Sequence, residues 1–207
     1  MIEIRQIDKQ HSGDINIQNE PFELFGKMIP SLENGKWGYD VVHFSPEETA
    51  EMCFPDENYC FDDMTDSVFL GAYDGEKCVG LAVLQPGFFK YMYLYDLKVD
   101  RAYRGRHIGK MLIDAAKETA ARLGYFGLYT QGQDNNLGAC LFYIKAGFCI
   151  GGFDSNVYRH TSREEKAAII FYTECGKKGE GLTPDGTAAR HGKERAAQLP
   201  KAARIDI

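Results

Sequence analysis

Residues 100–112 read DRAYRGRHIGKML, with two glycines and four Lys or Arg residues just ahead of an apolar pattern. The apolar positions from Ile108 to Leu123 recur at helical intervals, and Gly124 offers a stop for that helix. An electropositive helix N-terminus preceded by small residues can hold a phosphate group. The stretch therefore predicts an anion site at a strand-to-helix junction, although a basic, solvated first turn explains the isolated stretch as well. Neither the Walker A spacing nor G-x-G-x-x-G is present.

The overall composition is that of an ordinary globular chain. With 207 residues, 44% of them hydrophobic and 26% charged, the chain is long enough for one well-buried domain plus an appendage. A formal net charge of −6 argues against a nucleic-acid partner and favours a cationic or neutral one. No apolar run approaches the ~20 residues that span a bilayer, and the N-terminus lacks a signal-peptide pattern. We therefore expect a cytoplasmic protein with no membrane partner.

Six cysteines occur without a C-x-x-C pair and without histidines at zinc spacing. In a reducing compartment they are expected to be free thiols rather than disulfides or metal ligands. The sequence therefore predicts no metal site.

The remaining pattern predicts strands and helices that alternate in the second half of the chain. The pair Asp74-Gly75 separates two β-rich runs and predicts a hairpin over residues 67–87. Residues 19–44 are expected to combine a short amphipathic helix with turns. The other expected elements are strands at 2–7, 91–100, 125–133, 149–158 and 167–175 and helices at 108–123 and 137–148. This order indicates an α/β or α+β fold with at least partly parallel pairing.

Residues 176–207 differ in composition from the rest of the chain. They carry seven Lys or Arg against four Asp or Glu and few large apolar residues, so we interpret them as a basic C-terminal tail. Residues 1–175 are expected to form the domain. They carry a net charge of −9, because the tail contributes +3 to the total of −6.

The order of elements around the opening stretch resembles the GNAT superfamily of acyl-CoA N-acyltransferases. The phosphate loop of that family has the form Q/R-x-x-G-x-G/A; here Arg104 starts it and Gly109 ends it, with His107 at the usual middle glycine. Asn136 and Tyr143 fill the family's second signature. The resemblance implies a mixed sheet of six to seven strands, flanked by helices and splayed where acetyl-CoA inserts. The residues that it implies in binding acetyl-CoA are Leu97, Val99, Arg104, Gly105, Arg106, His107, Ile108, Gly109, Lys110 and Asn136.

Two of these positions leave a choice of roles. His107 has a side chain where the family's backbone approaches the phosphates, so it points away from them or adds a donor. Asn136 binds the cosubstrate, caps the following helix, or does both.

Three longer segments resemble streptothricin acetyltransferases within that superfamily. They are residues 19–39, 130–158 and 168–174, and the first of them separates this group from generic GNAT enzymes. The resemblance covers residues 2–175 and implies acetylation of an amine on the β-lysine chain of streptothricin, an antibiotic-resistance activity. The residues expected to bind the acceptor are Phe22, Trp37, Tyr95, Gln131, Asp154 and Tyr158, of which the last two match the family's segment next to the acceptor cleft.

Acetylation of an amine requires a neutral nucleophile and a proton donor for the departing thiolate. A primary ammonium titrates near ~10.4, so the site must assist removal of its proton. Tyr143 matches the family's proton donor, with a core tyrosine as the alternative. Cys140 has no His partner at a recognisable spacing, so direct transfer is favoured over an acyl-cysteine and packing is the expected role of this thiol.

The general base is less clearly marked. The two positions where such enzymes often carry Glu are Tyr95 and Gln131 in this chain. Asp96 is the remaining carboxylate, and it acts as base or substrate anchor or only bonds locally. The second choices are Asp134 and Asp154. Proton removal through ordered water, without one dominant base, is also compatible with these replacements.

Residues 45–66 contain eight Asp or Glu and no Lys or Arg. Such an acidic belt attracts a cationic acceptor such as streptothricin, or it is only a solvated face. Phe22, Trp37 and Tyr39 supply aromatic walls for the acceptor, or they belong to the core.

Other functions remain open on the sequence alone. The acceptor could be another cationic amine, such as a polyamine, an aminoglycoside or a protein N-terminus. The replacements at His107, Gln131 and Tyr95 leave room for an acyl-CoA-binding protein without catalysis. The charge of residues 1–175 opposes a nucleic-acid arm in the tail, and a homodimer through edge strands is expected by analogy only.

Overall fold

A computed structural model describes residues 1–176 of the chain. Its elements are β1 (Ile2–Gln6), η1 (Lys9–Ile15), β2 (Phe22–Leu24), β3 (Gly26–Glu33), β4 (Lys36–His43), β5 (Ala50–Met52), β6 (Val68–Asp74), β7 (Lys77–Gln85), β8 (Tyr91–Val99), η2 (Arg101–Tyr103), α1 (Ile108–Arg122), β9 (Gly127–Gln133), α2 (Leu137–Lys145), β10 (Cys149–Asp154) and β11 (Ala168–Glu174). Apart from Gly176, the tail expected at 176–207 lies outside the described residues. No described helix is long and apolar enough to cross a membrane.

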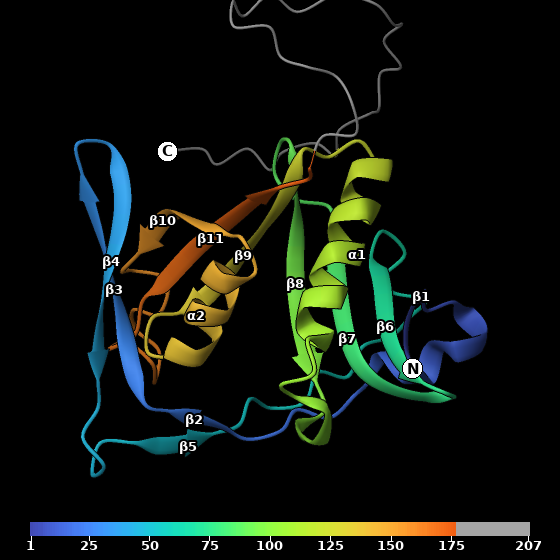
Figure 1. Ribbon diagram of the computed structural model, residues 1–207, viewed down its shortest axis with the longest axis horizontal. Helices are drawn as coiled ribbons and strands as arrows, with labels where there is room; N and C mark the ends of the chain where they lie inside the picture. Colours follow the sequence, from blue (N-terminus) through green and yellow to red (C-terminus); the bar gives the residue numbers. More distant parts are fainter. Residues whose placement is uncertain (177–207) are drawn as a thin grey trace, which may run out of the picture. The chain divides into compact units, whose positions relative to one another are not determined.

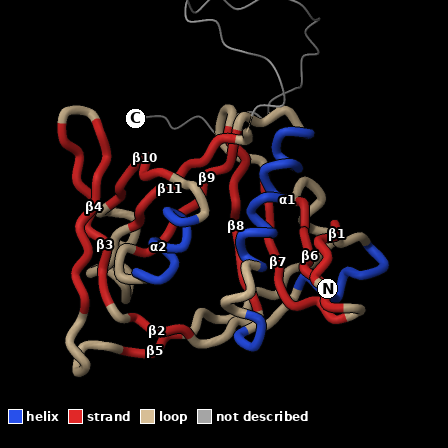
Figure 2. Tube along the Cα trace, in the orientation of Figure 1, coloured by secondary structure: helices blue, strands red, loops and turns tan. Residues whose placement is uncertain are grey.

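Seven strands form the central sheet in the order β1-β6-β7-β8-β9-β11-β10 (Figures 1 and 2). Neighbouring strands are antiparallel except β8 and β9, which run parallel. The parallel pair arises because the crossover between these two strands passes through α1. The expected mixed sheet of six to seven strands flanked by helices is confirmed.

The sheet is splayed between β8 and β9. The two strands pair only from Tyr91↔Gly127 to Tyr93↔Tyr129, whereas β8 continues to Val99. On its other side β8 is paired with β7 along its length, with one register shift opposite Val83 and Leu84 that leaves Tyr95 as the extra residue of a bulge. We refer to the parted region beyond Tyr93 as the β8–β9 splay.

The main core lies between the sheet and its two helices (Figure 1). The helix α1 buries its apolar stripe against β6, β7, β8 and β9, and the fully buried side chains on it are Ile108, Leu112, Ile113, Ala116 and Ala120. Burying a Leu or Ile side chain stabilises the fold by about 1.5–3 kcal/mol, so this stripe fixes the helix firmly. A smaller cluster around Phe69, Leu81 and Val83 packs on the other face under η1 and the loop that carries Tyr59.

The expectation of a short helix within residues 19–44 is wrong. The segment forms β2, β3 and β4, and β3 pairs with β4 from Gly26↔His43 to Glu33↔Lys36. Asn34 and Gly35 both have positive φ, at 50° and 75°, which is the backbone that a tight two-residue hairpin turn requires. The strand expected at 149–158 is also shorter, because β10 ends at Asp154.

The β3–β4 hairpin is attached to the body of the fold at its base. Met28 N–H donates to the Asp134 carbonyl over 2.9 Å, and Gly26 forms a bridge with Asn136. In the hairpin, β4 thereby lies against β10 and β3 against α2 (Figure 1). The end of β9 and the start of α2 are therefore held by a segment more than a hundred residues earlier in the sequence.

Substitution of Gly26 by Ala should loosen this attachment. The added methyl carbon would lie 2.5 Å from the Val42 carbonyl oxygen and 2.6 Å from Leu137 Cδ2, so backbone must shift. We expect the free energy of unfolding, measured by urea titration, to fall by about 1–3 kcal/mol. Gly13→Ala is the matched control, because its added methyl meets nothing within 4 Å. An equal effect of the two substitutions would contradict the tight approach at Gly26.

Candidate active site

The loop before α1 has the backbone of a phosphate loop. Gly105 and His107 both have positive φ, at 78° and 61°. His107 is the N-cap of α1 and makes no side-chain capping bond, so the amides of the first turn have no side-chain partner. A left-handed backbone costs a non-glycine residue about 1–2 kcal/mol, and His is one of the residues that tolerates it best. His107 therefore preserves the backbone conformation that glycine adopts more easily.

The other residues of the first turn have separate roles. Ile108 is buried in the main core. A methyl carbon at Gly109 would lie 3.0 Å from Phe142 Cζ, so the glycine lets α1 approach α2 closely. Lys110 forms an ion pair with Asp114, one turn further along the helix. Arg106 is exposed and lies over the Tyr103 ring, with its guanidinium carbon 4.9 Å from the centroid.

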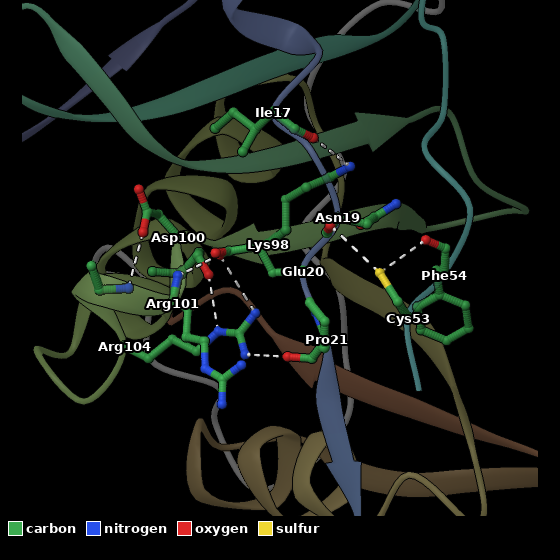
Figure 3. A network of polar contacts seen from close by, with 12 residues as sticks. Ile17, Asn19, Glu20, Pro21, Cys53, Phe54, Lys98, Asp100, Arg101 and Arg104 are labelled. Carbon is green, nitrogen blue, oxygen red and sulfur yellow. Dashed lines mark hydrogen bonds and ion pairs between the residues drawn. The ribbon is translucent and has the colours of Figure 1, made fainter. Parts of the chain in front are cut away.

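Arg104 is occupied by the protein itself (Figure 3). Its Nε donates to the Val99 carbonyl over 3.1 Å, and its Nη1 donates to the Pro21 carbonyl over 3.2 Å. The Glu20 carboxylate lies 3.9 Å from Nη2 and also accepts a hydrogen bond from the Arg101 backbone N–H. Arg104 therefore ties residues 20–21 to the loop instead of presenting a free guanidinium.

The backbone of β8 beyond Tyr93 faces the splay at alternate residues. Asp100 N–H donates to the Val79 carbonyl on β7 over 2.9 Å. Because successive residues direct their backbone groups to opposite edges of a strand, the backbone groups of Leu97 and Val99 are turned toward the splay. Both side chains pack against the main core. Both residues were expected from the sequence to bind the cosubstrate. Their backbone groups could bond to a ligand in the splay, except the Val99 carbonyl, which accepts a bond from Arg104.

Helix α2 carries the second signature. The Asn136 side chain accepts a hydrogen bond from Ala139 N–H over 3.2 Å, so it caps the helix. The Tyr143 ring packs against Phe148 and Phe171. Burial raises the pKa of the Tyr143 hydroxyl to about 12; nearby Thr130 acts in the opposite direction, and Asp96 adds to the increase. Thr130, whose hydroxyl donates to the Leu94 carbonyl over 2.9 Å, thus links β9 to β8 at the start of the splay.

Cys140 is buried on the same helix. Burial raises the pKa of its thiol to about 12, and its Sγ lies 3.4 Å from the Gln133 carbonyl oxygen. A thiol with this pKa is almost entirely protonated near neutral pH and is a poor nucleophile. The structure therefore favours the packing role expected for this cysteine.

Asp96 belongs to a network of buried charges on the other face of β8. Its Oδ2 accepts a hydrogen bond from Tyr59 over 3.1 Å and lies 3.1 Å from Lys98 Nζ. Lys98 Nζ is in turn 2.8 Å from Glu57 Oε2, which also accepts a bond from the Asn19 side chain. The Lys98 side chain is 10% exposed and that of Asp96 18%. These contacts involve only one of the two Asp96 carboxylate oxygens.

The network shifts the pKa values of its members in different directions. Burial raises the pKa of Asp96, and Lys98 only partly offsets this effect. Burial also acts to lower the pKa of Lys98, but its two carboxylates outweigh burial and raise it. The pKa of Glu57 is lowered, because the bonds from Lys98 and Asn19 exceed the opposing effect of burial. Lys98 is therefore firmly cationic, and Asp96 binds a proton more readily than an ordinary carboxylate.

The residues expected to bind the acceptor are only partly brought together. Tyr95 is 45% exposed in the bulge of β8, and Tyr158 lies near enough to Tyr93 to affect its pKa. Gln131 is exposed on β9. Phe22 packs against Phe54, with ring centroids 5.2 Å apart.

The other expected acceptor and base residues have local structural roles. Trp37 follows the turn of the β3–β4 hairpin, at the end away from β2 (Figure 1). Asp154 accepts bonds from the N–H groups of Asn156 and Val157, so it shapes the loop after β10. Asp134 is buried, accepts a bond from Ala167 N–H and pairs with Lys27 over 2.8 Å.

The acidic belt at residues 45–66 is partly neutralised by the fold. Glu57 pairs with Lys98, Asp62 pairs with Lys9 over 2.7 Å, and Glu51 lies 3.6 Å from Arg101. The other carboxylates of the belt form no ion pair within residues 1–176. Within residues 1–176, no group of three or more His, Cys, Asp or Glu side chains is placed to hold a metal ion.

Comparison with known proteins decides the family. The profile of the acetyltransferase (GNAT) family matches residues 33–148. The chain belongs to the GNAT family of acetyltransferases. Streptothricin acetyltransferase A of Bacillus subtilis (strain 168) is 31% identical over 159 residues, which cover 77% of this chain and 92% of that protein. A streptothricin acetyltransferase of Escherichia coli is 30% identical, covering 77% of this chain and 79% of its own length.

Solved structures agree with this assignment. A Bacillus anthracis str. Ames protein in complex with acetyl coenzyme A has a TM-score of 0.75 and 27% identity, covering 84% of this chain and 99% of that one. A nourseothricin acetyltransferase with 21% identity has a TM-score of 0.68, covering 84% and 98% of the two chains, and it shares the fold. The resemblance to GNAT enzymes expected from the sequence is confirmed.

Sequence reasoning missed two residues of the charge network around Asp96, Lys98 and Tyr59. The spacing of Asp96 and Lys98 was a usable signal, because residues two apart on a strand share a face and opposite charges there can pair. Tyr59 carried no such signal, since it lies in a loop whose position is set by contacts with β8.

Removal of the buried cation should destabilise the fold. In Lys98→Met, Asp96 would keep no cationic partner, and we expect the free energy of unfolding at pH 7 to fall by about 3 kcal/mol. The double variant Lys98→Met/Asp96→Asn should recover part of this loss, because it removes the uncompensated charge. Lys77→Met is the control, since its pair with Asp100 joins a largely exposed lysine and should contribute little to stability. Equal decreases in the free energy of unfolding for Lys98→Met and Lys77→Met would show that the network around Lys98 does not stabilise the fold.

Proposed function

We propose that this protein transfers the acetyl group of acetyl-CoA to a primary amine of a streptothricin-type antibiotic. The observation that carries the proposal is the splay between β8 and β9, with Asp96 on the parted segment of β8 and Tyr143 on α2, the helix that follows β9. The names of the curated relatives support the acceptor, and the acetyl coenzyme A in the Bacillus anthracis structure supports the donor.

The residues of the splay fit acetyl-CoA. The first turn of α1 offers amides without a side-chain cap, which suit a pyrophosphate, and Arg106, His107 and Lys110 lie beside them. The backbone groups of Leu97 and Val99 can bond to an extended amide-bearing chain as a missing strand would. Arg104 and Asn136 act through the loop and the helix cap that they hold in place. When bound, acetyl-CoA supplies a thioester carbonyl for attack by the amine.

Tyr143 is the proposed general acid. Its phenol remains protonated near neutral pH because burial raises its pKa to about 12. Its Oη can therefore keep a proton until the thiolate of coenzyme A departs. Transfer of that proton to the thiolate completes the replacement of the sulfur by the amine nitrogen on the acetyl group. The hydrophobic contacts with Phe148 and Phe171 fix its ring.

Asp96 is the proposed base or anchor for the acceptor amine. One carboxylate oxygen is fixed by Tyr59 and Lys98, which leaves the other for a substrate ammonium or a water. The raised pKa of Asp96 makes this carboxylate a better proton acceptor than an exposed one. Alternatively, Asp96 does not contact the acceptor amine directly, and the proton leaves the amine through a water molecule held by Asp96 and Gln131.

The acetyltransferase domain is proposed to comprise residues 1–175. The described part forms one compact unit, Met1–Gly176. A cytoplasmic location and an edge-strand homodimer remain predictions from the sequence. The alternative acceptors are a polyamine, an aminoglycoside or a protein N-terminus, since the field of the acidic belt attracts any cation.

Release of free coenzyme A tests the reaction directly. We expect saturable turnover of acetyl-CoA with streptothricin, and little with spermidine or an aminoglycoside. Tyr143→Phe should lower kcat by a factor of roughly 10²–10⁴, because it removes the proton donor while keeping the ring. Tyr125→Phe, on a tyrosine that packs against the main core, should leave kcat unchanged. Tight binding of acetyl-CoA without turnover on any acceptor would instead favour the non-catalytic alternative.

The pH profile tests the role of Tyr143 separately. An acid is active while protonated, so a phenol with a pKa of about 12 keeps its activity throughout the range from pH 7 to about 10.5. Over the same range the acceptor loses its proton, near ~10.4, so kcat/KM should rise without a downturn. A downturn between pH 9 and 10 in the wild type, absent from Tyr143→Phe, would show that the phenol titrates at its ordinary pKa.

A further inference from the structure

Five tyrosines from three neighbouring strands stand together on the face of the sheet away from α1 and α2. They are Tyr91, Tyr93 and Tyr95 on β8, Tyr129 on β9 and Tyr172 on β11. We call this set the tyrosine row. The residues that alternate with them, among them Leu94, Leu128 and Phe171, are buried in the main core, which places the tyrosines on the opposite face.

The rings of the row are ordered. Tyr93 stacks on Tyr129 with centroids 4.7 Å apart and planes 15° apart, and Tyr129 stacks on Tyr172 at 5.8 Å and 25°. Tyr95 meets Tyr93 edge-on at one end, and Tyr91 meets Tyr172 edge-on at the other. The Tyr172 ring packs directly on the backbone of Gly151, where any side chain would clash with Tyr172 Cδ2. The row is therefore a specific packing arrangement and not a chance gathering of exposed rings.

The row presents hydroxyl groups that the fold does not use. Side chains on strands stand roughly perpendicular to the sheet, so stacked tyrosines direct their phenol ends outward. Elsewhere Tyr59, Tyr73 and Tyr103 bond their hydroxyls to carboxylates. By contrast, none of the five hydroxyls of the row bonds to another residue within 1–176. Each therefore offers one donor and one acceptor to a ligand.

The row begins at the splay. Tyr93 and Tyr129 form the last residue pair before β8 and β9 part, so the row reaches the splay from the face opposite to α2. Tyr158, in the loop after β10, lies near enough to Tyr93 to affect the pKa of Tyr93. The Tyr59 ring meets the Tyr95 ring with centroids 6.2 Å apart. A molecule with one amine at the splay would therefore extend along the row.

The charge of this face suits a cation. The strands β8, β9 and β11 contain a single basic residue, Lys98, and it is paired with Asp96 and Glu57. Their acidic residues are Asp96 and Glu174, at opposite ends of the region. Phenol oxygens accept bonds from ammonium groups, and exposed ring faces such as that of Tyr95 attract cations.

We propose that the tyrosine row binds the body of the acceptor, a cationic molecule rich in amines and hydroxyls, while the reacting amine lies at the splay. This rests on the proposed acetyl transfer and adds its specificity site. Tyr129 and Tyr172 bond to the part of the acceptor remote from the reacting amine and take no part in proton transfer. They select for long, polar acceptors over short amines.

The double variant Tyr129→Phe/Tyr172→Phe tests the row, because it keeps the stacked rings and removes two hydroxyls. With streptothricin as acceptor, KM should rise roughly tenfold, as expected for two lost hydrogen bonds, while kcat and the KM for acetyl-CoA stay unchanged. With a short diamine as acceptor, KM should not change, because such a molecule does not reach the remote hydroxyls. Tyr125→Phe, on the opposite face, is the matched control, and equal thermal midpoints exclude a folding defect.

Each remaining outcome has a distinct meaning. If the wild type acetylates streptothricin and the double variant has the same KM, the row is not the acceptor site and the proposed function stands. If the wild type acetylates a polyamine or aminoglycoside instead, the proposed acceptor is wrong, and a raised KM for that amine in the double variant would still support the row. If no amine is acetylated and calorimetry detects no streptothricin binding in the presence of coenzyme A, both proposals fail.

Discussion

The parting of β8 from β9 is the constraint on which the rest of the structure depends. Two strands that stay paired satisfy each other's backbone groups, and two that part leave groups that need another partner. Here the pairing ends after Tyr93, and the bulge at Tyr95 turns β8 further out of register with its other neighbour. The helices α1 and α2 bury the apolar side chains of this region, and Arg104 takes up the Val99 carbonyl on the parted edge of β8. The opening is thus created by the sheet and stabilised by the core beneath it.

The segment before β6 supplies much of the chemistry around this opening. Glu57 and Tyr59 hold Asp96 and Lys98 in position, and Glu20 and Pro21 hold Arg104. These residues are far in sequence from the strands and loop that they contact. A buried charge network of this kind contributes modest stability for its size, because desolvation offsets much of the attraction. Its benefit is a carboxylate fixed in one orientation beside the sheet's opening.

The elements of the main sheet from β6 onward could be predicted from the sequence because their signals are local. The hairpin at Asp74-Gly75, the apolar stripe of α1 and the strands on either side each follow from periodicity and turn chemistry. The first half of the chain was harder, and the helix expected in residues 19–44 was wrong because the Asn34-Gly35 turn was given less weight than the apolar spacing. The site residues on β8 and α2 lay in recognisable motifs. The partners of Asp96 and the stacking of Tyr129 on Tyr93 depend on which strands become neighbours, and no local pattern specifies that.

The contacts of Arg104 with Glu20 and Pro21 affect how much order the loop before α1 must gain when it binds an anion. A free loop must be ordered when its ligand arrives, and fixing each backbone residue costs about 1–2 kcal/mol of conformational entropy. Here the bonds from Arg104 to Val99 and Pro21 fix the loop as part of folding, so the ordering precedes the encounter. The affinity of the loop for an anion would consequently depend on residues 20–21, which the anion itself does not contact. If the loop binds the pyrophosphate as proposed, substitution of Glu20, whose carboxylate lies beside Arg104, would alter cosubstrate affinity while the phosphate loop itself looks intact in an alignment.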